Sequence, residues 1–108
     1  MPPRPLDLDV AIYRDRVQVT NRATTTFADQ RANHEFSNAA SVVAEPRYLE
    51  DTIVRAIRQL AHEDRAFMLC DPIAHVVGCE TALDESERYI VESALHQSGM
   101  KTVVFEID

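Results

Sequence analysis

Residues that could bind a phosphate group are scarce in this chain. A phosphate loop presents backbone amides at close approach, and glycine is the residue that permits this geometry. The sequence has two glycines, Gly78 and Gly99, and neither lies in a GxGxxG or Walker-type motif. Gly99 is better explained as the end of a helix. We therefore expect no nucleotide cofactor and no ATP hydrolysis by this chain.

The histidines and cysteines are scattered rather than grouped. The four histidines occur singly, and the sequence contains no HxxxH, HExxH or CxxC motif, so no metal site is predicted. His62 and His96 fall near predicted helix ends, where a positive charge offsets the helix dipole. Cys79 would need a lowered pKa and a nearby base to act as a nucleophile, and neither is visible. We expect Cys79 and Cys70 to be buried free thiols.

Composition and charge narrow the classes of function. The chain has 108 residues, which predicts one domain. A net charge of −7 argues against non-specific binding to nucleic acid or to an anionic membrane surface. No apolar run has the length of a membrane span, and residues 1–7 lack the apolar region of a signal peptide. We expect an extended tail over 1–7, a single domain over 8–108 and a reducing, cytoplasmic location.

Strand patterns dominate the first half of the chain. Alternation predicts strands over 8–13 and 16–20, with a tight hairpin at Arg14–Asp15 between them. The β-branched residues of 23–29 predict a third strand. Residues 30–40 are expected to form a loop, and 41–45 a short extended piece.

Helical periodicity begins after Pro46. Apolar residues at 49, 53, 56, 57 and 60 share one face, which predicts a helix over 47–63. The apolar run over 73–80 is expected to be the central strand of the sheet, and the run over 66–70 is either the end of a connection or an extra edge strand. Asp84 with Glu87 forms a capping box for the second helix, which Gly99 ends. Residues 101–107 complete the sequence as a buried strand.

The resulting order, β-β-β-α-β-α-β, is that of the ribonuclease-H-like α/β fold, a mixed sheet that is also half of the actin fold. Nucleases of this fold hold two metal ions on carboxylates from the first strand, the first helix and the end of the fourth strand. Asp9, Glu50 and Glu80 fall near these places. A metal-dependent nuclease is therefore the alternative function. Eighteen acidic residues also supply such a triple by chance, and no basic groove accompanies it.

The segment "VVGCETALDESER" carries a resemblance to a known family, together with the sequence that follows it. Glu87-Arg88 begins a helix, Gly99 follows Glu87 by twelve residues, and Val103-Val104 lies in the next strand. These offsets resemble those of bacterial actin homologues of the rod-shape-determining MreB type. Upstream, "AIYRDRVQVTN" is similar to the first hairpin of that family, and "YLEDTIVRAIRQL" is similar to its first long helix.

The resemblance implies a fold without the family's ATP chemistry. MreB-type proteins bind ATP between two lobes through glycine-containing loops, but the hairpin here is Arg14-Asp15-Arg16. Cys79-Glu80-Thr81 stands near the place of the family's Pro-Ser-Gly. The second phosphate loop would lie beyond Asp108. We therefore expect a lone first subdomain, not an enzyme, that acts as a protein–protein interaction module of the bacterial actin-like cytoskeleton. Its expected partner is an actin-like protein or a second copy, bound through edge strands or the helix face.

Overall fold

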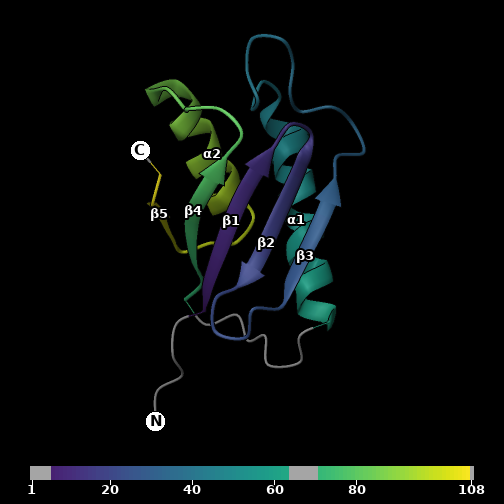
Figure 1. Cartoon of the computed structure of the whole chain (residues 1–108), viewed down its shortest axis with the longest axis vertical. Coiled ribbons are helices and arrows are strands. Elements are labelled where there is room, and N and C mark those ends of the chain that lie inside the picture. The colour runs from purple at the N-terminus through teal and green to yellow at the C-terminus, as the bar shows by residue number, and fades with distance from the viewer. Residues whose placement is uncertain (1–5, 64–70, 108) are drawn as a thin grey trace.

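The structure is a computed structural model that describes residues 6–63 and 71–107 (Figure 1). The apolar run over 66–70, including Cys70, lies outside the described residues. The elements are β1 (Asp7–Tyr13), β2 (Arg16–Asn21), β3 (Phe27–Arg31), α1 (Pro46–Glu63), β4 (Ile73–Cys79), α2 (Glu85–Gln97) and β5 (Thr102–Phe105). This is the predicted α/β element order.

The strands form one five-stranded mixed sheet in the order β3-β2-β1-β4-β5. The pairs β1–β2 and β2–β3 are antiparallel. The pairs β1–β4 and β4–β5 are parallel, so the chain crosses back over the sheet through α1 and through α2. One half of the sheet is therefore an antiparallel meander, and the other half is parallel (Figure 1).

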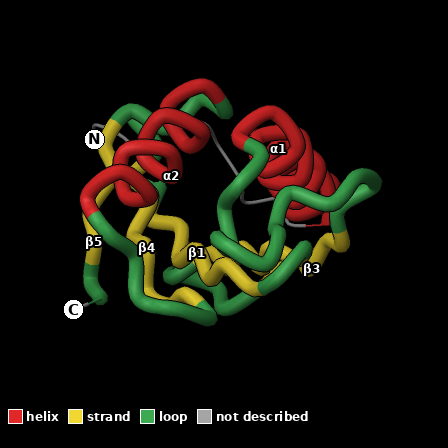
Figure 2. Tube along the Cα trace, turned by 90° about the horizontal axis from the view of Figure 1, so that it is seen from above, coloured by secondary structure: helices red, strands yellow, loops and turns green. Residues whose placement is uncertain are grey.

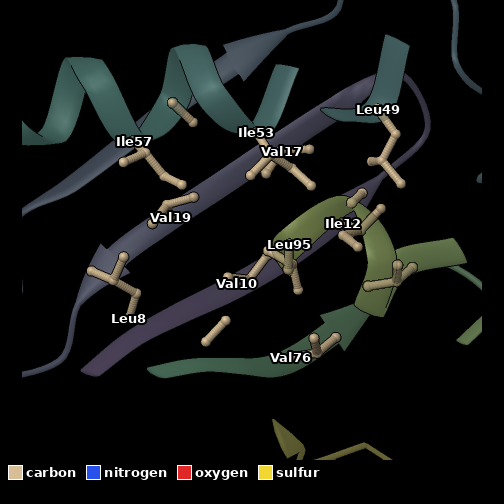
Figure 3. Close-up of a cluster of buried hydrophobic side chains, with 14 of the residues drawn as sticks. Leu8, Val10, Ile12, Val17, Val19, Leu49, Ile53, Ile57, Val76 and Leu95 are labelled. Carbon is tan, nitrogen blue, oxygen red and sulfur yellow. The ribbon is translucent and has the colours of Figure 1, made fainter. Parts of the chain in front are cut away.

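Both helices lie on the same side of the sheet (Figure 2). α1 packs over β2 and β3, and α2 lies against α1 and β5. Strict alternation in β1 and β2 directs one set of side chains to the helices, where they are buried. Figure 3 shows this cluster, which includes Leu8, Val10, Ile12, Val17, Val19, Leu49, Ile53, Ile57, Val76 and Leu95.

The opposite side of the sheet, named the open face here, carries the alternate set of strand side chains. They are half-buried or exposed, and no helix of the described residues covers them. The open face consists of Asp7, Asp9, Ala11, Tyr13, Arg16, Gln18, Thr20, Phe27, Asp29, Arg31, Ile73, His75, Val77, Thr102 and Val104.

The ends of α2 follow the sequence signals. The Asp84 side chain accepts a hydrogen bond from the Glu87 amide at 2.7 Å, and the Glu87 side chain accepts one from the Asp84 amide at 3.0 Å. Gly99 follows the helix with a φ of 106°, in the left-handed region that favours glycine. The predicted capping box and helix end are confirmed.

The loop between β3 and α1 departs from the prediction. Residues 42 and 43 form a turn instead of the extended piece expected over 41–45, and Phe36, Val42 and Val43 are buried in the core. Ser37 fastens it to the β1–β2 hairpin: its amide donates to Asp15 Oδ1 at 2.8 Å, and its hydroxyl accepts from the Asp15 amide at 3.0 Å. Tertiary packing of these apolar side chains overrides the local extended preference.

Two boundaries and the burial of one strand also differ from the prediction. β3 begins at Phe27 rather than at residue 23, because Asn21 and Thr26 close a turn through a backbone hydrogen bond of 2.8 Å. The tail expected over 1–7 is wrong for its last two residues, since Leu6 is buried and Asp7 begins β1; residues 1–5 lie outside the described residues. β5 is not a buried strand. It is an edge strand with a helix on one side only, and Val104 is 39% exposed.

Candidate functional site

The carboxyl ends of β1 and β4 meet at one edge of the sheet, which is where α/β folds place ligands. A small polar hollow of about 210 Å³ lies there, bordered by Arg14, Ser41, Thr81 and Glu87 among others. The Arg14 guanidinium lies 3.6 Å from the Glu80 carboxylate. Ser41 donates a hydrogen bond to Glu87 at 2.6 Å. Side chains from the hairpin, the long loop and the β4–α2 connection therefore converge at this end.

Several hydrogen-bond donors at this end already have partners within the chain. In the hairpin, the Asp15 amide donates to Ser37, and the Arg14 guanidinium donates to the Asn38 carbonyl at 2.8 Å. At the α2 N-terminus, a carboxylate of the capping box takes the place that a phosphate would occupy. An anionic phosphate at the Asp84 and Glu87 amides would compete with the two carboxylates of the capping box, which already accept from them.

The three carboxylates of the predicted nuclease site do not converge. Asp9 lies on the open face and accepts a hydrogen bond from Arg22 at 2.8 Å. Glu50 lies on α1, in the helix layer on the other side of the sheet. Glu80 pairs with Arg14 at the carboxyl end of β4. Within the described residues, no group of three His, Cys, Asp or Glu side chains could hold a metal ion.

A charge cluster on and beside the open face was not predicted from the sequence. It consists of Asp7, Asp9, Arg22, His75 and Glu106. Arg22 lies 2.6 Å from Asp9 and 2.7 Å from Glu106, and so links the end of β5 to β1. His75 in β4 contacts Asp7 and Glu106, each at 2.8 Å. The cluster joins three neighbouring strands and the turn after β2.

The pKa shifts in this cluster are those expected of ion pairs that stabilise the fold. Hydrogen bonding to Arg22 lowers the pKa of Glu106, and the nearby His75 lowers it further. Asp9 and Glu106 together raise the pKa of Arg22. His75 Nδ1 lies close to Glu106 but makes no well-aligned hydrogen bond within the described residues. No local sequence pattern indicated this pairing, because Arg22 and Glu106 lie just outside β2 and β5 and their partners are distant in the sequence.

Cys79 is half-buried and packs against the hydrophobic core. Burial raises the pKa of its thiol, which keeps the thiol protonated and poorly nucleophilic. The structure therefore supports the prediction of a packing role for Cys79.

Large apolar side chains are exposed on both layers. Phe27 is 55% exposed, and Val77 and Val104 are each 39% exposed on the open face. Tyr89, which is 72% exposed, borders a hollow of about 380 Å³ between α1 and α2. Parallel sheets are usually covered on both faces, so the exposed valines of β4 and β5 identify the parallel half of the open face as the candidate interaction surface.

Comparisons with known proteins found no matching protein-family model and no matching curated protein. Within the described residues, no helix combines the length and apolar character needed to cross a membrane.

Proposed function

We propose that this chain is a non-enzymatic protein–protein interaction domain of ribonuclease-H-like topology, related to the bacterial actin-like cytoskeleton. One observation carries the proposal: three backbone amides at the carboxyl ends of β1 and β4 donate to the chain's own Ser37, Asp84 and Glu87 side chains. These hydrogen bonds stabilise the fold at the end of the sheet where an α/β protein could bind a ligand.

The sheet topology supports the choice of fold. A meander followed by two parallel strands, in the order β3-β2-β1-β4-β5, is the arrangement expected for one half of the actin fold. The residues that carry the resemblance also have structural roles in this chain. Glu87 closes the capping box, Gly99 ends α2, and Val103-Val104 forms the centre of β5.

The uncovered parallel half of the sheet supports an interaction role. Its exposed residues include Val77 and Val104, and the charge cluster lies beside them. A protein partner that performs this role covers the open face of the sheet.

The first test asks whether the domain has nucleotide or metal chemistry. We expect calorimetric titration with ATP and Mg²⁺ to give no heat of binding. Incubation of DNA and RNA with Mg²⁺ or Mn²⁺ is expected to leave both intact. Micromolar ATP affinity, or cleavage abolished by Asp9→Asn, would contradict the proposal.

The second test asks whether the partner is actin-like. We expect the domain to co-sediment with filaments of an MreB-type protein. Val77→Asp should abolish this association because it places a charge on the open face, whereas Tyr89→Asp alters only the helix layer and serves as the control. Failure of the wild-type domain to co-sediment would remove the cytoskeletal assignment.

A further inference from the structure

The two edges of the sheet are protected very differently. β3 carries the charged residues Asp29 and Arg31, and Arg55 from α1 donates to the Arg31 carbonyl at 3.0 Å. β5 carries no charge in its four residues, "TVVF", and within the described part of the chain it pairs only with β4. Charges and covering groups are the usual means of preventing edge-to-edge pairing. β5 lacks them.

The backbone of β5 is arranged to accept another strand. The amides of Thr102 and Glu106 donate to carbonyls at the β4 side of the ladder, Pro72 and Val76. Because successive residues of a strand alternate, the backbone groups of Val103 and Phe105 point to the free edge. Glu106 is held by Arg22 and His75, so the strand remains extended beyond Phe105.

We propose that the β5 edge binds the β5 edge of a second copy, antiparallel about a two-fold axis, to form one continuous sheet. This inference rests on the proposed interaction function and adds a second binding surface to it, the β5 edge, beside the open face. A two-fold axis between antiparallel edges is perpendicular to the sheet, so both helix layers lie on the same side. Both helix layers lie on the same side only in registers that place helix-side residues of one strand opposite helix-side residues of the other.

One such register is favoured by the side chains. With Val104 opposite the partner's Val104, Val103 lies opposite the partner's Phe105, and Thr102 lies opposite the partner's Glu106. The Val103–Phe105 pairs are then the hydrogen-bonded pairs, in agreement with the outward direction of those backbone groups. Each is also an aromatic–β-branched pair, a kind of cross-strand pair that stabilises antiparallel strands.

The neighbouring register is less favourable. Centring the axis on Val103 would place the charged Lys101 opposite the apolar Phe105 of the partner. It would also place Val104, which is 39% exposed, opposite Thr102 rather than an apolar side chain. The register centred on Val104 buries the apolar side chains against each other.

A residue of the helix layer also lies beside the β5 edge. The guanidinium of Arg88 on α2 lies 5.4 Å from the centre of the Phe105 ring. Pairing of the two edges therefore brings Arg88 of each copy close to the joint on the helix side. A single short strand still buries less than the roughly 1,600 Å² of a standard interface, so we expect association at micromolar rather than nanomolar concentration.

The test is a disulfide that only this register allows. Directly opposite residues of a non-hydrogen-bonded pair have Cα atoms about 4.5 Å apart, within disulfide range. We expect Val104→Cys, in a background of Cys70→Ala and Cys79→Ala, to form a covalent dimer under mild oxidation. Val77→Cys, equally exposed on the open face but in β4, is the matched control and should form no covalent dimer.

A second measurement does not depend on oxidation. Sedimentation equilibrium at tens of micromolar should give a mass approaching twice the 12.2 kDa of the chain. Val104→Lys, which places two like charges at the axis, should return it to 12.2 kDa with unchanged circular dichroism. A wild-type mass that stays at the monomer value would overturn the inference. Cross-linking at Val103→Cys but not at Val104→Cys would overturn the register.

These outcomes are separable from the proposed function. A monomer that still co-sediments with MreB-type filaments removes the β5 dimer and leaves the interaction role intact. A dimer that hydrolyses ATP removes the proposed function while the β5 pairing stands.

Discussion

The two faces of the sheet carry different kinds of side chain. The face under α1 and α2 is a continuous apolar core in which Leu8, Val10 and Ile12 are essentially inaccessible. The open face carries a charge cluster and the exposed valines of β4 and β5. The covered face supplies the free energy of folding, whereas the open face fixes how the strands are joined and what they can contact. The predictions below test this division.

The largest expected difference in the free energy of unfolding is between substitutions of two phenylalanines. Phe36 is buried in the core although it lies in a loop, whereas Phe27 is 55% exposed on the open face. Phe36→Ala is expected to lower the free energy of unfolding by about 3–5 kcal/mol, as for a core position. Phe27→Ala, the same chemical change, should cost less than about 1 kcal/mol. Urea denaturation of both variants measures the difference, and equal losses would contradict the division between the faces.

Neighbouring residues of α1 provide the next comparison. Ile53 is buried under the sheet, and Val54 is half-buried on the outer side of the helix. Ile53→Ala should lower the free energy of unfolding by about 2–5 kcal/mol. Val54→Ala should have little effect, because alanine's better helix propensity offsets the lost contact. Comparable denaturation midpoints for the two variants would show that α1 does not pack as described.

The covered face was largely predictable from the sequence, because its signals are local. The period of α1 placed Leu49, Ile53 and Leu60 on one side, and the capping box placed the start of α2. Alternation in β1 and β2 separated buried from outward residues. Phe36 was missed because its burial depends on the loop folding back over the hairpin, and the flanking sequence is polar.

The open face was less predictable, because its interactions join distant parts of the chain. Arg22 pairs with Glu106, which lies 84 positions away in the sequence, and no local sequence pattern indicates such a pair. The predicted triple of Asp9, Glu50 and Glu80 failed for the related reason that a fold-level analogy does not say which face a helix residue reaches. The exposure of β5 was missed because "TVVF" is equally suited to a buried strand and to an edge strand.

A smaller effect is expected from the charge cluster, and it depends on pH. Arg22 lowers the pKa of Glu106 in the folded state, so this carboxylate stabilises the fold above its ordinary pKa of 4.5. Glu106→Gln should therefore lower the melting temperature near pH 7. The difference from the wild type should close as the pH falls below 4.5, where the unpaired carboxyl group of the unfolded chain is protonated.

Glu35→Gln is the control for this titration, since Glu35 is exposed and outside the cluster. It should shift the melting temperature little at any pH. A gap between Glu106→Gln and the wild type that persists unchanged at low pH would assign the effect to packing rather than to charge.

The smallest effect concerns the turn that joins β2 to β3, at the end of the sheet. Thr25 has a φ of 62°, a left-handed conformation that is strained for a β-branched residue. Its amide donates to the Asn21 carbonyl at 2.7 Å, so the backbone of the turn holds it there. Asparagine tolerates this conformation, and Thr25→Asn should raise the free energy of unfolding by about 1 kcal/mol. Thr26→Asn, at a neighbouring position without a positive φ, should give no gain. If both variants shift the urea midpoint equally, the stabilisation comes from the new side chain and not from the relief of backbone strain.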